Sequence, residues 1–206
     1  MTAITRRTAL QLALLCLAPP AAMAQEQPDA PDWRSRLVDA AREQIGVTIL
    51  YDPTYMRLTY PGGDVAPERG VCTDVVVRAY RRAFGLDLQR LVHEDMLADF
   101  AAYPKIWGLK APDRNIDHRR VQNLAVFFGR RGVSLAVSQN PVDFQPGDLV
   151  TQMLPGNLPH IAIVSSNRSM EEPERALVTH NSGQGAHDDD TLFAFKQTGH
   201  FRFAPA

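Results

Sequence analysis

The spacing of apolar residues changes once along this chain, close to residue 132, and this change limits the folds open to it. Before that point apolar residues recur at three- and four-residue intervals, as in helices that bury one face. After it they form short runs split by Pro, Gly and Asn, as in strands. Helices first and strands later predict an α+β fold with the helices packed on one antiparallel sheet. The expected helices are 33–44, 72–84, 87–101 and 117–131, and the expected strands are 133–137, 147–154, 160–166, 176–182 and 199–203.

Residues at the predicted helix ends support these boundaries. Asp32, Asp87 and Asp117 stand where an N-cap side chain accepts a backbone N–H. Gly85 and Gly132 stand where a glycine ends a helix. Between the first two helices, a short β-rich run (47–52) precedes an irregular stretch that contains the turn YPGGD.

The N-terminus has the pattern of a secretory signal peptide. Arg6 and Arg7 precede an apolar run, and Ala22-Met23-Ala24 matches an A-x-A cleavage site. We therefore expect a leader at 1–24, a linker at 25–34 and a single domain at 35–206. The leader would direct the protein to the periplasm or to secretion, and the arginine pair leaves both Sec and twin-arginine export open.

The composition of the remainder limits its partners. The chain has 22 basic and 23 acidic residues, and two of the basic ones lie in the leader, so twenty basic residues oppose 23 acidic ones. This mild acidity argues against nucleic acid as a partner. Outside the leader we find no apolar run of the roughly 20 residues that a membrane-spanning helix needs, and we expect a monomer.

Cys72 is the only cysteine beyond the leader, since the other, Cys16, lies within it. Cysteines of exported proteins usually come in pairs, so a single one is a buried bystander, a link between copies, or a reactive thiol. The sequence places Cys72 in the first turn of a helix, where unpaired N–H groups and the helix dipole favour the thiolate. The oxidising compartment favours a functional thiol.

Two histidines are candidate partners for that thiol. His160 begins the apolar strand HIAIVSS, and His180 lies near the end of the next strand, where antiparallel pairing could bring it beside His160. Asn181 follows and would face the other side of that strand. Each histidine taken alone is more simply a satisfied residue at a strand end. A thiol hydrolase, however, needs an imidazole to carry the proton and a third group to orient it.

Four motifs in chain order resemble the NlpC-type cell-wall peptidases, a bacterial branch of the papain-like cysteine hydrolases. They are TYPGGD with Tyr60, the helix start at Cys72, the PGD turn at 146–148, and the strands that carry His160 and His180. The likeness covers roughly residues 35–203. It implies a papain-like fold with the nucleophile at a helix N-terminus, and it is closest to an uncharacterised family of exported bacterial proteins related to the NlpC type.

The resemblance also implies a role for each residue. Cys72 would attack an amide carbonyl, and His160 would pass the proton to the leaving amine. His180, or alternatively Asn181, would fix the tautomer of His160. The backbone N–H of Cys72, helped by the Tyr60 hydroxyl, would hold the oxyanion. The expected substrate is a peptidoglycan stem peptide or a related cell-envelope peptide, and no cofactor or metal is expected.

The sequence departs from the NlpC pattern in two places. The family's Asp-Cys-Ser-Gly is replaced by GVCTDV, and Asp74 would oppose a nearby thiolate unless it faces away or pairs with an arginine. The segment 86–132 is also longer than the family core needs. Acyl transfer by the same residues and a non-catalytic envelope-binding module therefore remain alternatives to hydrolysis.

Three segments invite a metal interpretation. Residues 113–124 alternate acidic and amide side chains but lack the glycine and the final carboxylate of an EF-hand, so we expect a helix cap there. As an alternative to a purely structural role for this segment, Arg119 and Arg120 could line a substrate pocket. VHEDM lacks the second histidine of a zinc peptidase. HDDD (187–190) is most simply a solvated loop, although His187 with Asp188 could hold a metal, as could His160 and His180 with an acid.

Overall fold

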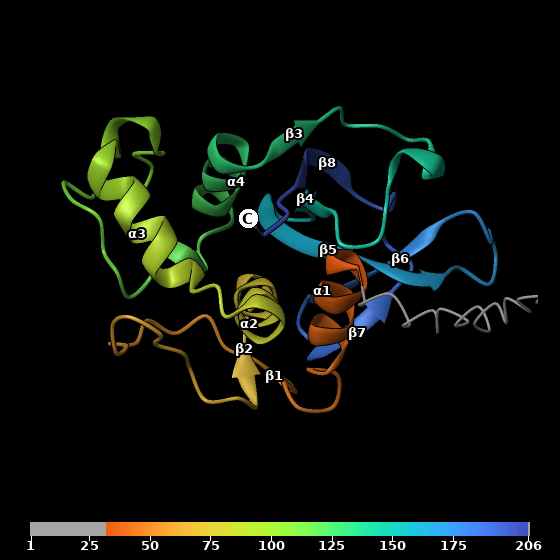
Figure 1. The fold of residues 1–206 in the computed structure, drawn as a ribbon, viewed down its shortest axis with the longest axis horizontal. Helices are drawn as coiled ribbons and strands as arrows, with labels where there is room; N and C mark the ends of the chain where they lie inside the picture. The colour runs from red at the N-terminus through yellow and green to blue at the C-terminus, as the bar shows by residue number, and fades with distance from the viewer. Residues whose placement is uncertain (1–31, 206) are drawn as a thin grey trace, which may run out of the picture. The chain divides into compact units, whose positions relative to one another are not determined.

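The computed structural model describes residues 32–205, so the predicted leader and most of the predicted linker lie outside the described residues (Figure 1). The helices are α1 (Trp33–Arg42), α2 (Cys72–Phe84), α3 (Leu88–Ala98) and α4 (Val121–Arg131), with short 3-10 turns η1 (Phe100–Ala102), η2 (Asp117–Arg119) and η3 (Pro141–Asp143). The strands are β1 (Leu50–Tyr51), β2 (Arg69–Gly70), β3 (Val133–Leu135), β4 (Leu149–Leu154), β5 (Leu158–Arg168), β6 (Ala176–Asn181), β7 (Ala186–Asp189) and β8 (Lys196–Arg202).

The main sheet has six strands in the order β3-β8-β4-β5-β6-β7, and every neighbouring pair is antiparallel. β1 and β2 form a separate two-residue parallel pair. The predicted α+β class with an antiparallel sheet is therefore confirmed. The expectation that HDDD is a loop is wrong, because residues 187–189 belong to β7 and pair with β6.

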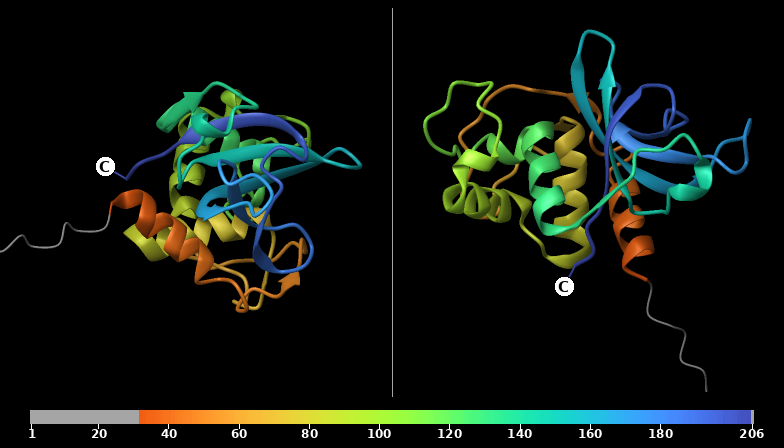
Figure 2. Two further views of the ribbon diagram at one scale, coloured as in Figure 1. Left: turned by 90° about the vertical axis from the view of Figure 1, so that its right-hand side faces the viewer. Right: turned by 90° about the horizontal axis from the view of Figure 1, so that it is seen from above.

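Three helices, α1, α2 and α4, cover one face of this sheet, while α3 packs against α2 and α4. α1 and α2 both contact β5 and β6, and α4 contacts β8 (Figures 1 and 2). Val75, Val76 and Tyr80 of α2 are fully buried, and they share a core cluster with Ile161 and Ile163 of β5. Burial of each large aliphatic side chain contributes about 1.5–3 kcal/mol, so this face anchors α2 to the sheet.

The other face of the sheet is covered by loop residues. Alternate residues of β5, Ala162 and Val164, pack there with Phe144 and Leu192 in a second apolar cluster. Side chains alternate across a strand, so the two clusters lie on opposite faces of β5.

Several helix boundaries agree with the sequence and others differ. α2 spans the expected residues and ends at Gly85, whose φ of 68° is left-handed and favours glycine. Asp87 caps α3 through the N–H of Gln89, as expected. The helix expected from Asp117 is wrong, because η2 comes first and an extended Arg120 separates it from α4. The domain also begins before residue 35, since Trp33 and Arg34 already belong to α1.

None of the helices between residues 32 and 205 combines the length and the hydropathy that a membrane crossing requires.

Candidate active site

Cys72 is the first residue of α2, and its side chain is 3% exposed. The backbone N–H groups of Ile161, Thr73 and Cys72 itself face the sulfur. Ile161 immediately follows His160 on β5. The fold therefore brings the thiol at the N-terminus of α2 to β5, the strand that carries the predicted base.

The thiol lies where β5 and β6 stop pairing. Between residues 32 and 205, β5 and β6 pair at Ile163↔Thr179 and Val164↔Val178 but not from there toward His160, where β5 pairs with β4 alone. Near this opening the Asn181 side chain donates a 3.0 Å hydrogen bond to the carbonyl of Gly70, two residues before Cys72. Asn181 thus ties the end of β6 to the start of α2.

Burial decides the protonation of Cys72. It raises the pKa of the thiol from its ordinary value of 9.0 to about 11, and nearby Asp74 adds to the rise, while the backbone N–H groups oppose it. The expectation of a resting thiolate is therefore not supported, because loss of hydration outweighs the helix terminus. At neutral pH Cys72 is therefore a neutral thiol.

Alkylation of Cys72 should therefore be slow at neutral pH. A thiol pKa of about 11 in place of 9.0 leaves about 100-fold less thiolate at pH 7, and the rate should still be rising at pH 10. Reaction with iodoacetamide between pH 6 and 10, read by mass spectrometry, measures this, with urea-unfolded protein as the control. Rapid alkylation of the folded protein that is already constant at pH 6 would contradict it.

A chain of three side chains starts at His160. His160 Nε2 lies 2.7 Å from His180 Nδ1, and His180 Nε2 lies 3.3 Å from Asp189 Oδ2. Burial, followed by the charges of neighbouring histidines, lowers the pKa of His160 to about 3 and that of His180 to about 4. Both rings are thus neutral at pH 7, and a neutral ring donates at one nitrogen and accepts at the other.

His160 and the thiol are adjacent along the sheet but not bonded in the described structure. Between residues 32 and 205 no hydrogen bond joins Cys72 Sγ to an imidazole ring. His160 alternates with Ile161, so its ring leaves β5 on the face that carries Ala162, while α2 covers the Ile161 face. The link between them is the backbone, because the N–H at the sulfur belongs to Ile161, the residue that follows His160.

Asp74, which the sequence left as a problem beside the thiol, is neutralised by an arginine. Arg119 donates two hydrogen bonds of 2.9 Å to the Asp74 carboxylate, from Nε and from Nη2. The two side chains are 2% and 4% exposed. Asp74 also accepts the N–H of Val71, which caps the start of α2. This buried pair therefore holds the first turn that carries Cys72.

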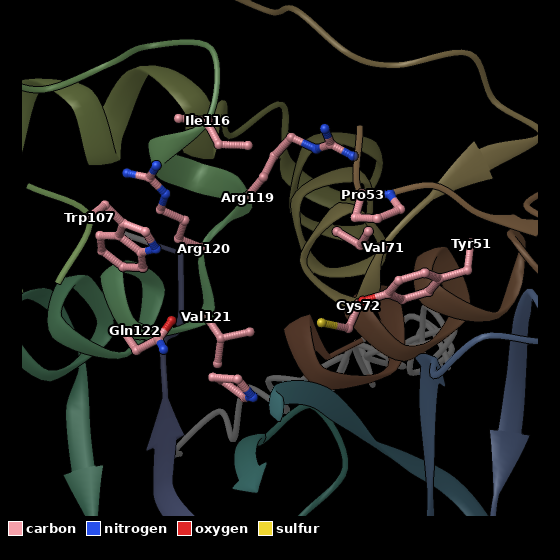
Figure 3. Close-up of a pocket in the computed structure, with 11 residues that line it drawn as sticks. Tyr51, Pro53, Val71, Cys72, Trp107, Ile116, Arg119, Arg120, Val121 and Gln122 are labelled. Atoms are coloured by element: carbon pink, nitrogen blue, oxygen red, sulfur yellow. The ribbon is translucent and has the colours of Figure 1, made fainter. Parts of the chain in front are cut away.

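A cavity of about 240 Å³ opens in front of Cys72 (Figure 3). Tyr51 extends toward Cys72 on one side, and Trp107 and Arg120 form the opposite wall. The guanidinium carbon of Arg120 lies over the Trp107 ring, 4.1 Å from its centroid. The remaining lining residues are Pro53, Val71, Ile116, Arg119, Val121, Gln122 and Pro159. The long segment 86–132 therefore contributes a wall of the cavity as well as α3 and α4.

Tyr60 lies elsewhere. Its ring packs edge-on against His93 of α3, with centroids 5.3 Å apart, and Arg114 lies 5.4 Å from its centre. It does not line the cavity in front of Cys72, whereas Tyr51 does. The sequence pointed to Tyr60 because of its Gly-rich turn, and only the β1–β2 pairing beside α2 brings Tyr51 to the thiol.

Sequence reasoning missed Asp189, and it did not identify which arginine pairs with Asp74. Asp189 was placed in a loop, although its alternation with His187 in HDDD is a strand period that could have identified it. The Arg119–Asp74 pair joins residues 45 positions apart, and no local pattern predicts it.

Comparison with known proteins identifies the family. Residues 38–203 match the profile of the family described as Domain of unknown function (DUF1287). The chain belongs to this family. It is also 52% identical over 167 residues to a protein of Escherichia coli (strain K12) named "Uncharacterized protein YijF", a match that covers 81% of this chain and 80% of that protein. In this DUF1287 member, Cys72, His160, His180 and Asp189 all lie within the matched residues.

Proposed function

We propose that this protein is a cysteine-dependent amide hydrolase with the NlpC-type arrangement, in which Cys72 is the nucleophile and His160 the base. The observation that carries the proposal is that Cys72 lies at β5 beside Ile161, next in the chain to the residue that begins the histidine chain. A thiol at a helix start faces the Ile161 amide, and the preceding residue begins the His160–His180–Asp189 chain. Nucleophile, base and orienting group are the three parts that such catalysis needs.

The tautomers of this chain suit a general base. If His180 donates its Nε2–H to Asp189, its Nδ1 accepts the Nε2–H of His160, and His160 Nδ1 is left free to take a proton. The Cys72 proton then passes to His160 Nδ1 as sulfur attacks the carbonyl carbon. His160 next gives that proton to the leaving amine, and water hydrolyses the thioester with His160 again as base. Hydrogen bonds of this kind often tighten only when substrate is bound.

The developing oxyanion needs donors near the thiol. The backbone N–H of Cys72 is the first, and the hydroxyl of Tyr51 replaces that of Tyr60 as the second, because Tyr51 lines the cavity. The Tyr51 pKa is raised, chiefly by burial, so the hydroxyl stays protonated and can donate a hydrogen bond to the oxyanion.

The cavity suits a peptide with an anionic group. Arg120 and Trp107 form a stacked cationic wall, and Gln122 adds an amide. Arginine recognises carboxylates through a planar fork of donors. Together with the predicted export signal, this favours stem peptides of peptidoglycan or a related envelope peptide as the substrate class.

The decisive experiment is digestion of purified peptidoglycan by the protein without its leader and by Cys72→Ala, with products identified by mass spectrometry. We expect new fragments from the wild type alone, because removal of the nucleophile removes the covalent step. An added amine acceptor separates acyl transfer, which would produce amine adducts, from hydrolysis. Identical fragments from wild type and Cys72→Ala would show that Cys72 is not the nucleophile.

The second candidate is a binding module that keeps the fold without the chemistry. The observation in its favour is the neutral, buried thiol, whose raised pKa is typical of an inert cysteine. The binding module would be the preferred function if the wild type and Cys72→Ala sediment equally with peptidoglycan and neither releases fragments.

A further inference from the structure

A second cluster of reactive side chains lies at the far end of the histidine chain. His180 and His187 face each other across the β6–β7 pair, and Asp189 lies two residues beyond His187 on the same face. One ligand atom from each of the three lies within 4.8 Å of the other two. His180 is buried, while His187 and Asp189 are 30% and 36% exposed, so solvent reaches the cluster.

We propose that His180, His187 and Asp189 bind a divalent transition-metal ion of the zinc class, and that this ion holds the His160–His180 pair in a tautomer that cannot act as a base. The binding step stands on the geometry of the cluster. The effect on catalysis rests on the proposed function.

Two of the three donor–donor distances are close to those around a bound metal ion. Asp189 Oδ2 lies 3.3 Å from His180 Nε2 and 3.7 Å from His187 Nε2. Zinc bound about 2.0–2.1 Å from each of its tetrahedral donors separates them by about 3.3 Å. Two imidazoles and a carboxylate are a common zinc set, and the fourth position remains for water.

The outer contacts of both histidines also match a metal site. His187 Nδ1 lies 2.9 Å from the carbonyl of Gly185, so its Nδ1 donates there and leaves Nε2 with a lone pair. His180 Nδ1 lies 2.7 Å from His160 Nε2 and can donate in the same way. Metal-binding histidines nearly always donate their second ring N–H to such a partner. The neighbouring Asp188 is instead occupied by Thr179, Arg42 and Asn167.

The two uses of His180 exclude each other. A metal on Nε2 of a neutral His180 requires the ring proton on Nδ1, which then donates to His160 Nε2. His160 must in turn carry its own proton on Nδ1, the atom that the proposed mechanism needs free. The metal-bound protein is therefore inactive, and removal of the metal restores the basic Nδ1 of His160.

Calorimetric titration of the leaderless protein with Zn²⁺ tests the binding step without reference to activity. We expect one site in the wild type, and a loss of affinity in His187→Ala greater than the roughly 10–100-fold that loss of an outer partner costs. His93→Ala, which removes a histidine of α3 that packs on Tyr60, is the matched control and should bind as the wild type does. Equal affinity in His187→Ala, or loss of the site in Cys72→Ala, would overturn the proposal.

Two further readouts keep the test decisive. Ring-nitrogen NMR of histidine-labelled protein should show Zn²⁺ on Nε2 of His180 and a proton on its Nδ1, whatever the substrate is. If His187→Ala does not fold, Asp189→Asn replaces it in the titration. On an identified substrate, Zn²⁺ should inhibit the wild type and not His187→Ala, and binding without inhibition would overturn the tautomer step while leaving the site in place.

Discussion

The Arg119→Ala variant is expected to unfold with a free energy about 3–5 kcal/mol below that of the wild type. The substitution leaves the Asp74 carboxylate, 4% exposed, without the two charge-assisted bonds that neutralise it. An uncompensated buried charge costs this much because it loses both water and its partner. Arg119 also donates to the carbonyls of Asp52 and Thr54, so these acceptors lose a donor as well. Urea unfolding at pH 7 measures the loss.

Two controls separate this effect from a general one. Arg82→Ala breaks a salt bridge to Glu43 whose side chains are 71% and 55% exposed, and it should cost no more than about 1 kcal/mol. Asp74→Asn combined with Arg119→Ala should cost less than the sum of the single losses, because the buried charge is gone. Equal losses in Arg82→Ala and Arg119→Ala would contradict the assignment.

His160→Gln should lower turnover by about 10²–10⁴-fold, the range that a positioned acid–base group contributes. Glutamine keeps a hydrogen-bonding group next to His180 but cannot carry the proton from Cys72. Asp189→Asn should give a smaller loss, because the amide disturbs the tautomer of His180 and leaves His160 in place. Steady-state kinetics on the fragment-releasing substrate, with metal removed by a chelator, gives both values.

His93→Gln is the matched control for this series, since it changes a histidine of α3 that has no link to the His160–His180–Asp189 chain. It should leave turnover unchanged. A loss in Asp189→Asn as large as that in His160→Gln would mean that the carboxylate does more than orient. Unchanged turnover in His160→Gln would remove His160 from the mechanism.

Part of the fold could be read from local patterns. The 3.6-residue spacing and Gly85 predicted α2 to its last residue, and the alternating runs predicted five of the strands of the sheet close to their places. These signals depend on neighbours in the chain, since a cap or a glycine acts within one turn. The order of Cys72, His160 and His180 was enough to suggest a site, and the structure joins the two histidines directly.

The parts of the fold and of the site that local patterns did not predict depend on contacts between residues distant in the sequence. β7 forms only because β6 offers it a paired edge, and that pairing turns HDDD from a loop into the strand that carries Asp189. Tyr51 takes the place expected for Tyr60 because β1 pairs with β2 beside α2. The sequence by itself determined the order of the elements and the types of side chain available for chemistry. Only the tertiary structure decided their protonation and their partners. Burial makes Cys72 a neutral thiol, and the fold brings Arg119 to Asp74. Both effects depend on chain segments that are distant in the sequence, so local patterns cannot predict them.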